Sequence, residues 1–482
     1  MLTLTDGASD RTCRGTTRRE LLRIGGLGLA GAAGLSLASV LALRERARAA
    51  GVTVRDRSVV LLFLQGGPSH IELFDPKMTA PVEIRSTTGE VKTTLPGVTF
   101  GGTFPKLARL AGKLAVVRSY ASGNSGHEYD RVLSAGNPLR ASASALYSRV
   151  AGLTHPATGL PRSALVLPEA IESGLELRRN FETGALPGLT TAGALGRSYE
   201  AFNPVGGGEV KDNMELRVPR GRLDDRRALL GGLDRLRRRL DADADPDAYA
   251  DAGGATASLD RYQAQAFDIL TRGAVEAFDL SREDPRTLAR YDTRGVFDRS
   301  VLNRYNDMYR ASNLLGHQLL LARRLCEAGC GFVTVADAGW DMHGNDNSLP
   351  RLSGIEPLGR QVDHAVAAFL EDVDARGLSD RILLVVTGEM GRTPRINDRG
   401  GRDHYGDLTS LVFAGGGLRM GQVIGRSDSH AARPATERFG PENLLATIFH
   451  ALFDVGLVRL ESELPSEVVK FITESQPIPG LL

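Results

Sequence analysis

The chain has 482 residues, of which 42% are hydrophobic and 24% charged, a balance typical of a globular protein with a large buried core. Its 59 Lys and Arg residues nearly equal its 58 Asp and Glu residues, which leaves a formal net charge of +1. This balance argues against a protein whose overall charge attracts nucleic acid or an acidic membrane surface. The length is compatible with one large domain or with two.

The first 50 residues have the pattern of an export signal. The pair Arg18-Arg19 precedes an apolar stretch rich in Gly and Ala, Ile24 to Leu43, and small residues at Ala47 to Ala49 suit a cleavage point. This pattern resembles a twin-arginine signal and predicts a periplasmic or extracellular protein that passes through the twin-arginine translocation machinery. The alternative is a membrane-spanning helix, since the stretch is about long enough to cross a bilayer. Its glycines favour a removable signal.

Six short apolar runs predict the strands of one sheet within residues 51–482. The first run, Ser58 to Leu64, is continuously apolar and ends at a Gly-Gly-Pro turn, as a buried parallel strand does. The other runs lie at Leu114–Val117, Ala164–Leu167, Phe332–Ala336, Ile382–Val386 and Leu408–Phe413. Helical patterns lie between them at Ser142–Ala151, Val301–Ala328, Leu358–Ala375 and Pro441–Leu452. This alternation predicts an α/β fold with helices on both faces of the sheet.

The segment from about residue 215 to 325 departs from that alternation. Asp224 to Leu240 has the charge pattern of an amphipathic helix, and a loop rich in Asp and Ala follows it before further helical patterns. The segment therefore predicts a helical insertion or cap on the sheet domain.

Three later fragments place metal-binding side chains near predicted strand ends. VADAGWDMHGN carries Asp341 and His343, TGEMGRTP carries Glu389, and GGRDHYGD carries Asp403 and His404. The carboxyl ends of parallel strands meet at one edge of a sheet, so these fragments are expected to form one split site. Carboxylate and imidazole groups bind zinc, manganese or calcium according to ligand number and geometry, and the sequence defines neither. The fragments predict a divalent metal ion of open identity.

Two earlier loops hold further candidates. His70 and Asp75 follow the first strand as possible site donors, or belong to plain turns around the Gly-Pro sequence. Ser125 and His127 precede a possible helix, whose exposed N–H groups favour anions. Ser125 is either a nucleophile or, like Asn124, a cap of that helix. His127 is the stronger catalytic candidate of the two.

The motifs WDMHGN, TGEMGRTP and GGRDHY, together with LQGGPSHIELFDPK and the twin-arginine leader, resemble those of an exported bacterial family. It is known as domain-of-unknown-function family 1501 and looks like a distant branch of the alkaline phosphatase and sulfatase superfamily. The resemblance implies an alkaline-phosphatase-like three-layer sandwich, with a mostly parallel sheet between helices. In that superfamily two metal sites lie at the carboxyl edge of the sheet.

The resemblance also implies ligand roles. Asp341 and His343 resemble the first late ligand pair, Glu389 the second carboxylate, and His404 the last histidine. The sequence departs from the superfamily pattern at two positions. Gly66-Gly67 and Met390 occupy places where the superfamily commonly has an Asp and a His.

Those departures remove two donors of a second metal. One possibility is that His70, Asp75 or His127 supplies the missing donors of a second metal. The other is that only one metal ion binds, and this is the expectation that we prefer. Arg392 or Arg402 could clamp a bound anion through paired hydrogen bonds, with surface salt bridges as the alternative role.

The expected activity is hydrolysis of an anionic ester, for which a polysaccharide is one possible carrier. A metal ion would polarise the ester and lower the pKa of water. Two alternatives remain open. One is a non-catalytic periplasmic binding or scaffold protein with a degenerate metal site, and the other is a metal-dependent isomerase or phosphotransferase. Fold alone does not decide among them.

Overall fold

The computed structural model describes residues 53–178, 181–184, 186–204, 218–244, 261–271, 274–346, 348 and 350–482. The predicted export signal at residues 1–50 lies outside this part of the chain. Among the described residues, no helix combines the length and the apolar character needed to cross a bilayer.

A seven-stranded sheet forms the centre of the molecule, in the order β11-β4-β10-β7-β1-β6-β5. Its strands are β1 (Ser58–Leu64), β4 (Ala115–Val117), β5 (Ser163–Val166), β6 (Phe332–Asp337), β7 (Ile382–Thr387), β10 (Leu411–Gly415) and β11 (Gln422–Ile424). β1 lies between β6 and β7 and is parallel to both, whereas β10 runs antiparallel to its neighbours β7 and β4. The mostly parallel α/β sheet predicted from the sequence is confirmed.

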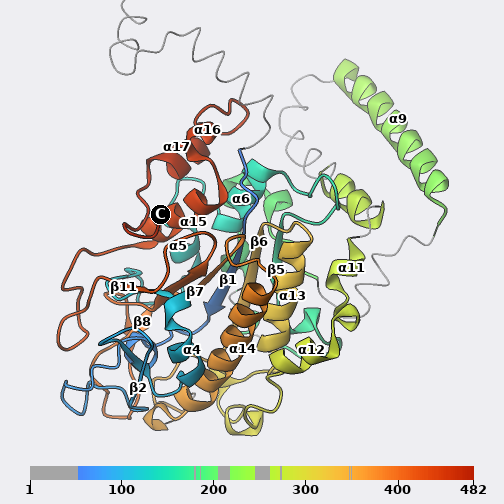
Figure 1. The fold of residues 1–482 in the computed structure, drawn as a ribbon. Helices are drawn as coiled ribbons and strands as arrows, with labels where there is room; N and C mark the ends of the chain where they lie inside the picture. Colours follow the sequence, from blue (N-terminus) through green and yellow to red (C-terminus); the bar gives the residue numbers. More distant parts are fainter. Residues whose placement is uncertain are drawn as a thin grey trace, which may run out of the picture.

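Helices cover both faces of this sheet (Figure 1). Val60, Leu62 and Leu64 of β1 belong to the core shared with the helices of one face, and the alternate residues Val59 and Leu61 to the core of the other. This alternation follows from the two-residue period of a strand. The first layer contains α4 (Pro105–Arg109), α12 (Pro285–Tyr291), α13 (Leu315–Glu327) and α14 (Ile355–Ala375). The second contains α5 (Tyr129–Ser134), α6 (Ala143–Ala151), α15 (Pro441–Leu452) and α17 (Ser466–Glu474).

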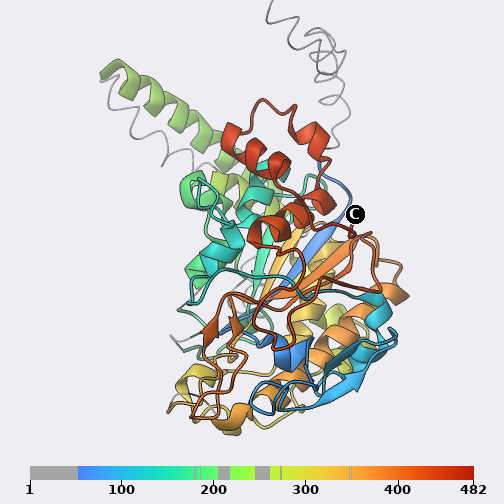
Figure 2. The ribbon, with the colours of Figure 1, turned by 90° about the vertical axis from the view of Figure 1, so that its left-hand side faces the viewer.

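The described fold has further elements outside these two layers. They are α3 (His70–Leu73), α7 (Leu186–Thr190), α9 (Arg220–Ala244), α11 (Val275–Phe278), α16 (Val455–Val458) and the paired strands β2 (Glu90–Lys92) with β3 (Thr99–Gly101) and β8 (Gly391–Arg392) with β9 (His404–Tyr405). Figures 1 and 2 show α9 projecting from the rest of the molecule. By contrast α12 and α13, which the sequence placed in the insertion, pack against α14 and the sheet.

The helix predicted from Val301 to Ala328 is wrong in its first half. α13 begins only at Leu315, after two short turns of 3-10 helix. The side chain of Asn303 accepts a hydrogen bond from the N–H of Arg310 and donates one to its carbonyl oxygen. Such side-chain contacts compete with the hydrogen bonds of a helix, and here they replace them.

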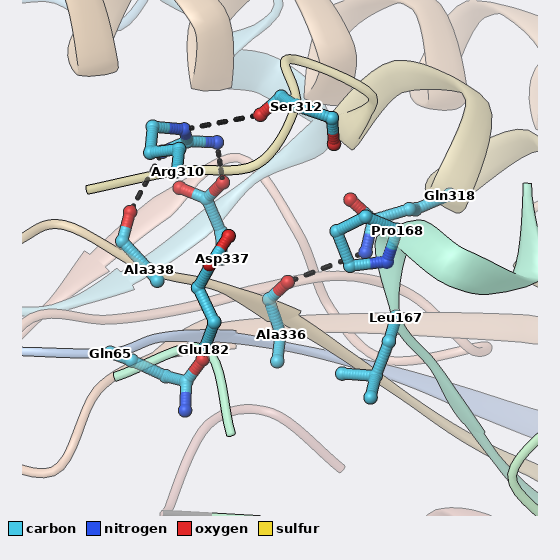
Figure 3. A pocket seen from close by; sticks show the side chains of 10 residues that line it. All are labelled: Gln65, Leu167, Pro168, Glu182, Arg310, Ser312, Gln318, Ala336, Asp337 and Ala338. Atoms are coloured by element: carbon cyan, nitrogen blue, oxygen red, sulfur yellow. Dashed lines mark hydrogen bonds and ion pairs between the residues drawn. The ribbon is translucent and has the colours of Figure 1, made fainter. Parts of the chain in front are cut away.

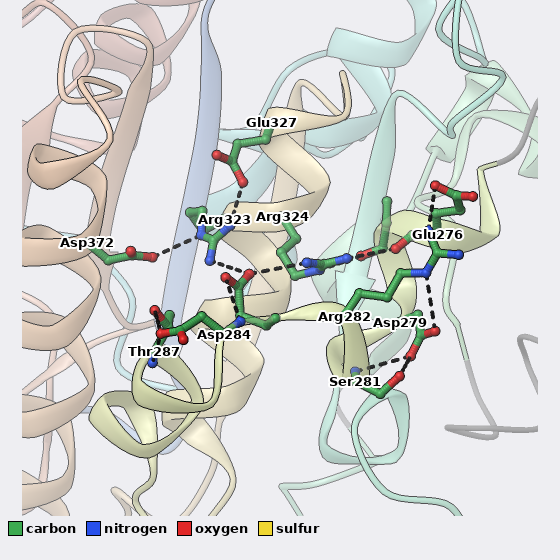
Figure 4. Close-up of polar contacts among 12 residues, drawn as sticks. Glu276, Asp279, Ser281, Arg282, Asp284, Thr287, Arg323, Arg324, Glu327 and Asp372 are labelled. Atoms are coloured by element: carbon green, nitrogen blue, oxygen red, sulfur yellow. Dashed lines mark hydrogen bonds and ion pairs between the residues drawn. The ribbon is translucent and has the colours of Figure 1, made fainter.

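A buried group of ion pairs connects the helices of the first layer (Figure 4). Arg323 of α13 is 1% exposed and contacts Glu283 at 2.6 Å, Glu327 at 2.5 Å and Asp372 of α14 at 2.9 Å. Arg376 pairs with the same Glu283 and Asp372, at 2.9 Å each. The pairing is nearly complete, as a charge buried in an apolar layer requires.

Candidate metal centre

The predicted site residues gather at one edge of the sheet. Asp341 and His343 follow β6, Glu389 follows β7, and His127 lies between β4 and α5. These strands share one direction, so their carboxyl ends open on the same side, where ligands bind in sheets of this kind. His404 arrives from β9, directly opposite Arg392 of β8.

Asp341, His343 and His404 bring three donor atoms together. The Nε2 atoms of His343 and His404 lie 2.8 Å and 3.2 Å from Oδ1 of Asp341, and 2.9 Å from each other. Three tetrahedral ligands of zinc lie about 3.3 Å apart, given metal–ligand distances of about 2.1 Å. The spacing of the three atoms is close to that of one small cation's ligands.

His127 approaches the same carboxylate from its other oxygen. Its Nε2 lies 3.6 Å from Oδ2 of Asp341. His127, Asp341 and His404 also offer one donor atom each within 4.8 Å of one another, so two sets of ligands share Asp341. We favour the set with His343, because its donor atoms are closer together, and regard His127 as the neighbouring group.

The carboxylate lies at the bottom of the site and the imidazoles reach solvent. The side chain of Asp341 is 6% exposed, whereas those of His343, His404 and His127 are 20%, 24% and 29% exposed. A cation held by the first two rings would therefore remain accessible to a substrate.

The electrostatics of the site favour a charged Asp341. Burial alone would raise the pKa of Asp341, but hydrogen bonds from His127, His343 and His404 and the charge of Arg392 lower it well below its usual range. Burial likewise lowers the pKa of His127, and the carboxylates of Asp341 and Glu389 outweigh it, raising that pKa to about 9. Asp341 is therefore held in its ionised form, which is the form that binds a metal ion.

Glu389 contacts His127, and through this ring it is connected to the metal-binding side chain of Asp341. Its side chain is fully buried, and its Oε1 lies 2.9 Å from Nδ1 of His127 and accepts the N–H of Gly66 at 2.8 Å. Gly66 has a φ of +112°, and a Cβ there would lie 2.6 Å from the backbone nitrogen of Asp341. Only glycine fits this close crossing of two chain segments.

Arg392 and Arg402 are both buried, with exposures of 2% and 0%, so the alternative of surface salt bridges is wrong for both. The guanidinium of Arg392 contacts Asp341 and donates to the carbonyl oxygens of Gly66, Gly67 and Arg402. It supports the backbone under the site, and its hydrogen-bonding groups face protein rather than a substrate. Arg402 pairs with the buried carboxylate of Glu72, at 2.9 Å.

His70 lies apart from the donor group. It is 5% exposed, and its Nε2 is 3.0 Å from the carbonyl oxygen of Ala431. Asp75 is also occupied elsewhere, by Ser427, Lys77 and Arg118. The structure does not bring either residue to Asp341, and the ligand role predicted for His70 gains no support from its position.

The burial of His70 predicts a pH-dependent stability. Burial, the largest effect, lowers its pKa from 6.5 to about 4. The unfolded chain therefore takes up a proton in that interval and the folded chain does not, so stability is lost as the pH falls from 6.5 towards 4, by roughly 3 kcal/mol. His70→Gln keeps an N–H for Ala431 and removes the titration. Urea unfolding at both ends of that interval should show a smaller loss for the variant, and equal losses would contradict the assignment.

The loop before α5 presents His127 but not Ser125. Ser125 is exposed, and no side-chain hydrogen bond caps α5. The buried Asn124 orders the loop, because its amide accepts the N–H of Gly126 and donates to the backbone carbonyl of Glu389. The nucleophile role of Ser125 stays a prediction, while His127 points towards the site.

Three neighbours of the site received no role in the interpretation of the sequence. Phe181 packs edge-on against His127, with ring centroids 4.7 Å apart. Asp307 has a raised pKa, through burial and then the charge of Asp341. Asp403 places Oδ1 3.6 Å from the Nδ1 of His343. The first two follow no strand and belong to no motif, so only the folded chain identifies them.

A small polar cavity lies beside the segment that carries Asp341 (Figure 3). Its volume is about 20 Å³, enough for a water molecule. Arg310 crosses it to contact Asp337 and the carbonyl oxygen of Ala338. Asp337 in turn accepts the indole N–H of Trp340 at 2.9 Å, and Trp340 is 1% exposed. Trp340 is therefore packed in the interior beside the segment that carries Asp341.

A family model described as "Protein of unknown function (DUF1501)" matches residues 56–455. The chain belongs to this family. The resemblance inferred from the three late motifs is thereby confirmed, and no curated protein matches the chain.

Solved structures similar to the family member include a sulfatase, a phosphonate monoester hydrolase and an alkaline phosphatase. The PsFucS1 sulfatase from Pseudoalteromonas sp. is 11% identical, with 86% of this chain and 70% of that chain covered and a TM-score of 0.33. The phosphonate monoester hydrolase SpPMH from Silicibacter pomeroyi is 12% identical, with coverages of 88% and 78% and a TM-score of 0.32. The alkaline phosphatase from the Antarctic bacterium TAB5 is 10% identical, with coverages of 85% and 99% and a TM-score of 0.26. At such scores the strand order of the sheet, and not these similarities, defines the fold.

Proposed function

We propose that this protein is a metal-dependent hydrolase of the sulfatase or phosphatase type that acts on an anionic ester. The observation that carries the proposal is the convergence of His343 and His404 on the buried carboxylate of Asp341. A cation held there would polarise the ester and lower the pKa of water to about 7.

The donor set favours zinc or manganese over calcium. Calcium takes six to eight oxygen ligands, whereas this set has two imidazole nitrogens and one carboxylate. Imidazole suits zinc and other transition metals, and three protein ligands leave a position for substrate, as in catalytic zinc sites.

The other residues of the site have distinct proposed tasks. Asp341, His343 and His404 would hold the cation through the carboxylate and the two Nε2 atoms, and Arg392 holds Asp341 from beneath. His127 lies on the other side of the same carboxylate and is partly open to solvent. It is the group best placed to move a proton between water and the leaving oxygen.

The substrate class and cellular location belong to the same proposal. The N-terminal twin-arginine pattern supports export, and thereby a site outside the cytoplasm. An ester attached to a polysaccharide is a fitting substrate in that compartment.

The proposal is tested by metal content and turnover of the same preparation. Purified protein is analysed for metals by mass spectrometry and assayed with aryl sulfate and aryl phosphate esters, before and after treatment with a chelator. His404→Ala should lose both metal and turnover, and His430→Ala, a change of an exposed histidine in another loop, should lose neither. Turnover that is unaffected by both the chelator and His404→Ala would reject the hydrolase proposal.

A second candidate is a metal-binding protein without catalysis. It is favoured by the contacts of Arg392, whose guanidinium is occupied by Asp341 and backbone carbonyls and offers no clamp for a substrate anion. Bound metal together with no cleavage of either ester would support this candidate over the first.

A further inference from the structure

Glu389 was expected to be a metal ligand, and its contacts in the folded chain indicate a different task. One carboxylate oxygen, Oε1, takes both of its contacts, the N–H of Gly66 at 2.8 Å and Nδ1 of His127 at 2.9 Å. It reaches the donor group only through the ring of His127.

These contacts determine which nitrogen of His127 carries the proton. An ionised carboxylate oxygen only accepts hydrogen bonds, so Nδ1 of His127 must donate. When His127 gives up a proton and becomes neutral, the lone pair is then on Nε2, which is the nitrogen facing Asp341 at 3.6 Å. A carboxylate behind a histidine selects the tautomer and the ring orientation in this way.

The surroundings of Glu389 favour this role over direct metal binding. Its second oxygen, Oε2, is buried and has no hydrogen-bond partner in the described part of the chain. The side chain is 0% exposed, whereas the rings of His343 and His404 are open to solvent. Within the described structure no hydrogen bond or ion pair joins Glu389 to Asp341, His343 or His404, and its one side-chain contact with the site is the ring of His127.

We propose that Glu389 is a positioning residue, which holds Nδ1–H of His127 so that Nε2 is presented to the site, and that it does not bind the metal. The inference rests on the proposed function in that His127 is taken as the proton-transfer group. Gly66 is part of the same device, because its N–H holds Oε1 in place while its missing side chain lets Asp341 approach.

The experiment compares Glu389→Gln, Glu389→Leu, His127→Ala and the double variant Glu389→Leu/His127→Ala with the wild type. Glu389→Gln keeps an oxygen acceptor at the position of Oε1 and serves as the conservative control. Zinc affinity is measured by competition with a chromophoric chelator. The ring N–H protons are observed by NMR of protein labelled with ¹⁵N-histidine, and the spectrum of His127→Ala assigns the His127 signal among the nine histidines.

We expect Glu389→Gln to lower the zinc affinity by less than about tenfold, the smallest typical cost of losing an outer contact to a metal ligand, because Glu389 contacts His127, which is not in the favoured ligand set. The Nδ1–H signal of His127 should persist in Glu389→Gln and disappear in Glu389→Leu. Turnover should fall equally in Glu389→Leu and His127→Ala, with no further fall in the double variant, because both changes remove the same pair.

Two results would overturn the inference. One is a loss of zinc affinity in Glu389→Gln of about 100-fold or more, as expected for a lost ligand. The other is an unchanged His127 signal in Glu389→Leu. Zinc binding and the NMR signal do not depend on turnover, so an inactive wild type would reject the hydrolase and still leave the role of Glu389 decided.

Discussion

Asp341→Asn is expected to lower the affinity for zinc by at least about 100-fold, and ester turnover with it. Loss of an outer hydrogen bond to a metal ligand typically costs 10- to 100-fold in affinity, and Asp341 is the shared centre of the donor group itself. The substitution keeps the shape of the side chain while removing the negative charge that His127, His343 and His404 all approach.

The same substitution has a second effect, on Arg392. The guanidinium would lose its only charged partner within the described structure while staying buried at 2% exposure. It keeps its contacts with four carbonyl oxygens, so the fold should survive with reduced stability. Circular dichroism and a thermal unfolding curve establish that the variant is folded before its zinc affinity is measured by competition with a chelator. Wild-type zinc affinity in a folded Asp341→Asn would refute the proposed site, and His430→Ala serves as the unaffected control.

Arg323→Met is expected to destabilise the protein by about 3–5 kcal/mol. Removing one member of a buried ion pair typically costs this much, and Arg323 contacts Glu283, Glu327 and Asp372. Arg376 contacts the same three carboxylates but its side chain is 34% exposed, so it compensates the buried ones only in part. The contacts join α13 to α14 and to the segment before α12, so the layer on that face of the sheet should loosen as a unit.

Urea unfolding of the purified variants measures this effect. Arg360→Met is the matched control, since Arg360 pairs with Glu356 on the surface of α14, with both side chains more than half exposed. An exposed pair four residues apart in a helix contributes about 0.3–0.5 kcal/mol. Similar losses for the two variants would show that the buried group does not stabilise the helical layer.

Much of the sheet could be predicted because its strands are buried on both faces. β1 and β7 are uninterrupted apolar runs, and the predicted bounds agree with Ser58–Leu64 and, to within one residue, with Ile382–Thr387. The direction of β10 could not be predicted, because an apolar run has the same composition whichever way the strand runs. The start of α13 was misplaced because the contacts between Asn303 and Arg310 depend on the fold around them.

The site was predictable to the extent that its residues follow strands. Asp341 and Glu389 could be placed together because they follow β6 and β7, and parallel strand ends share one edge. The order of contacts could not be predicted. The side-chain orientation of Glu389 determines whether its carboxylate faces a cation or Nδ1 of His127, and a sequence does not specify that orientation. The same holds for His70, whose ring contacts Ala431 and not Asp341.

The residues that build the site come from parts of the chain that are far apart in sequence, from Gly66 through His127 to His404. Contacts between such distant residues form late, because closing long loops costs entropy before any contact compensates for it. A nascent chain that lacks β9 has no His404 and only part of the cation site. Capture of the metal would therefore mark a polypeptide whose synthesis has passed residue 404 and whose sheet is assembled.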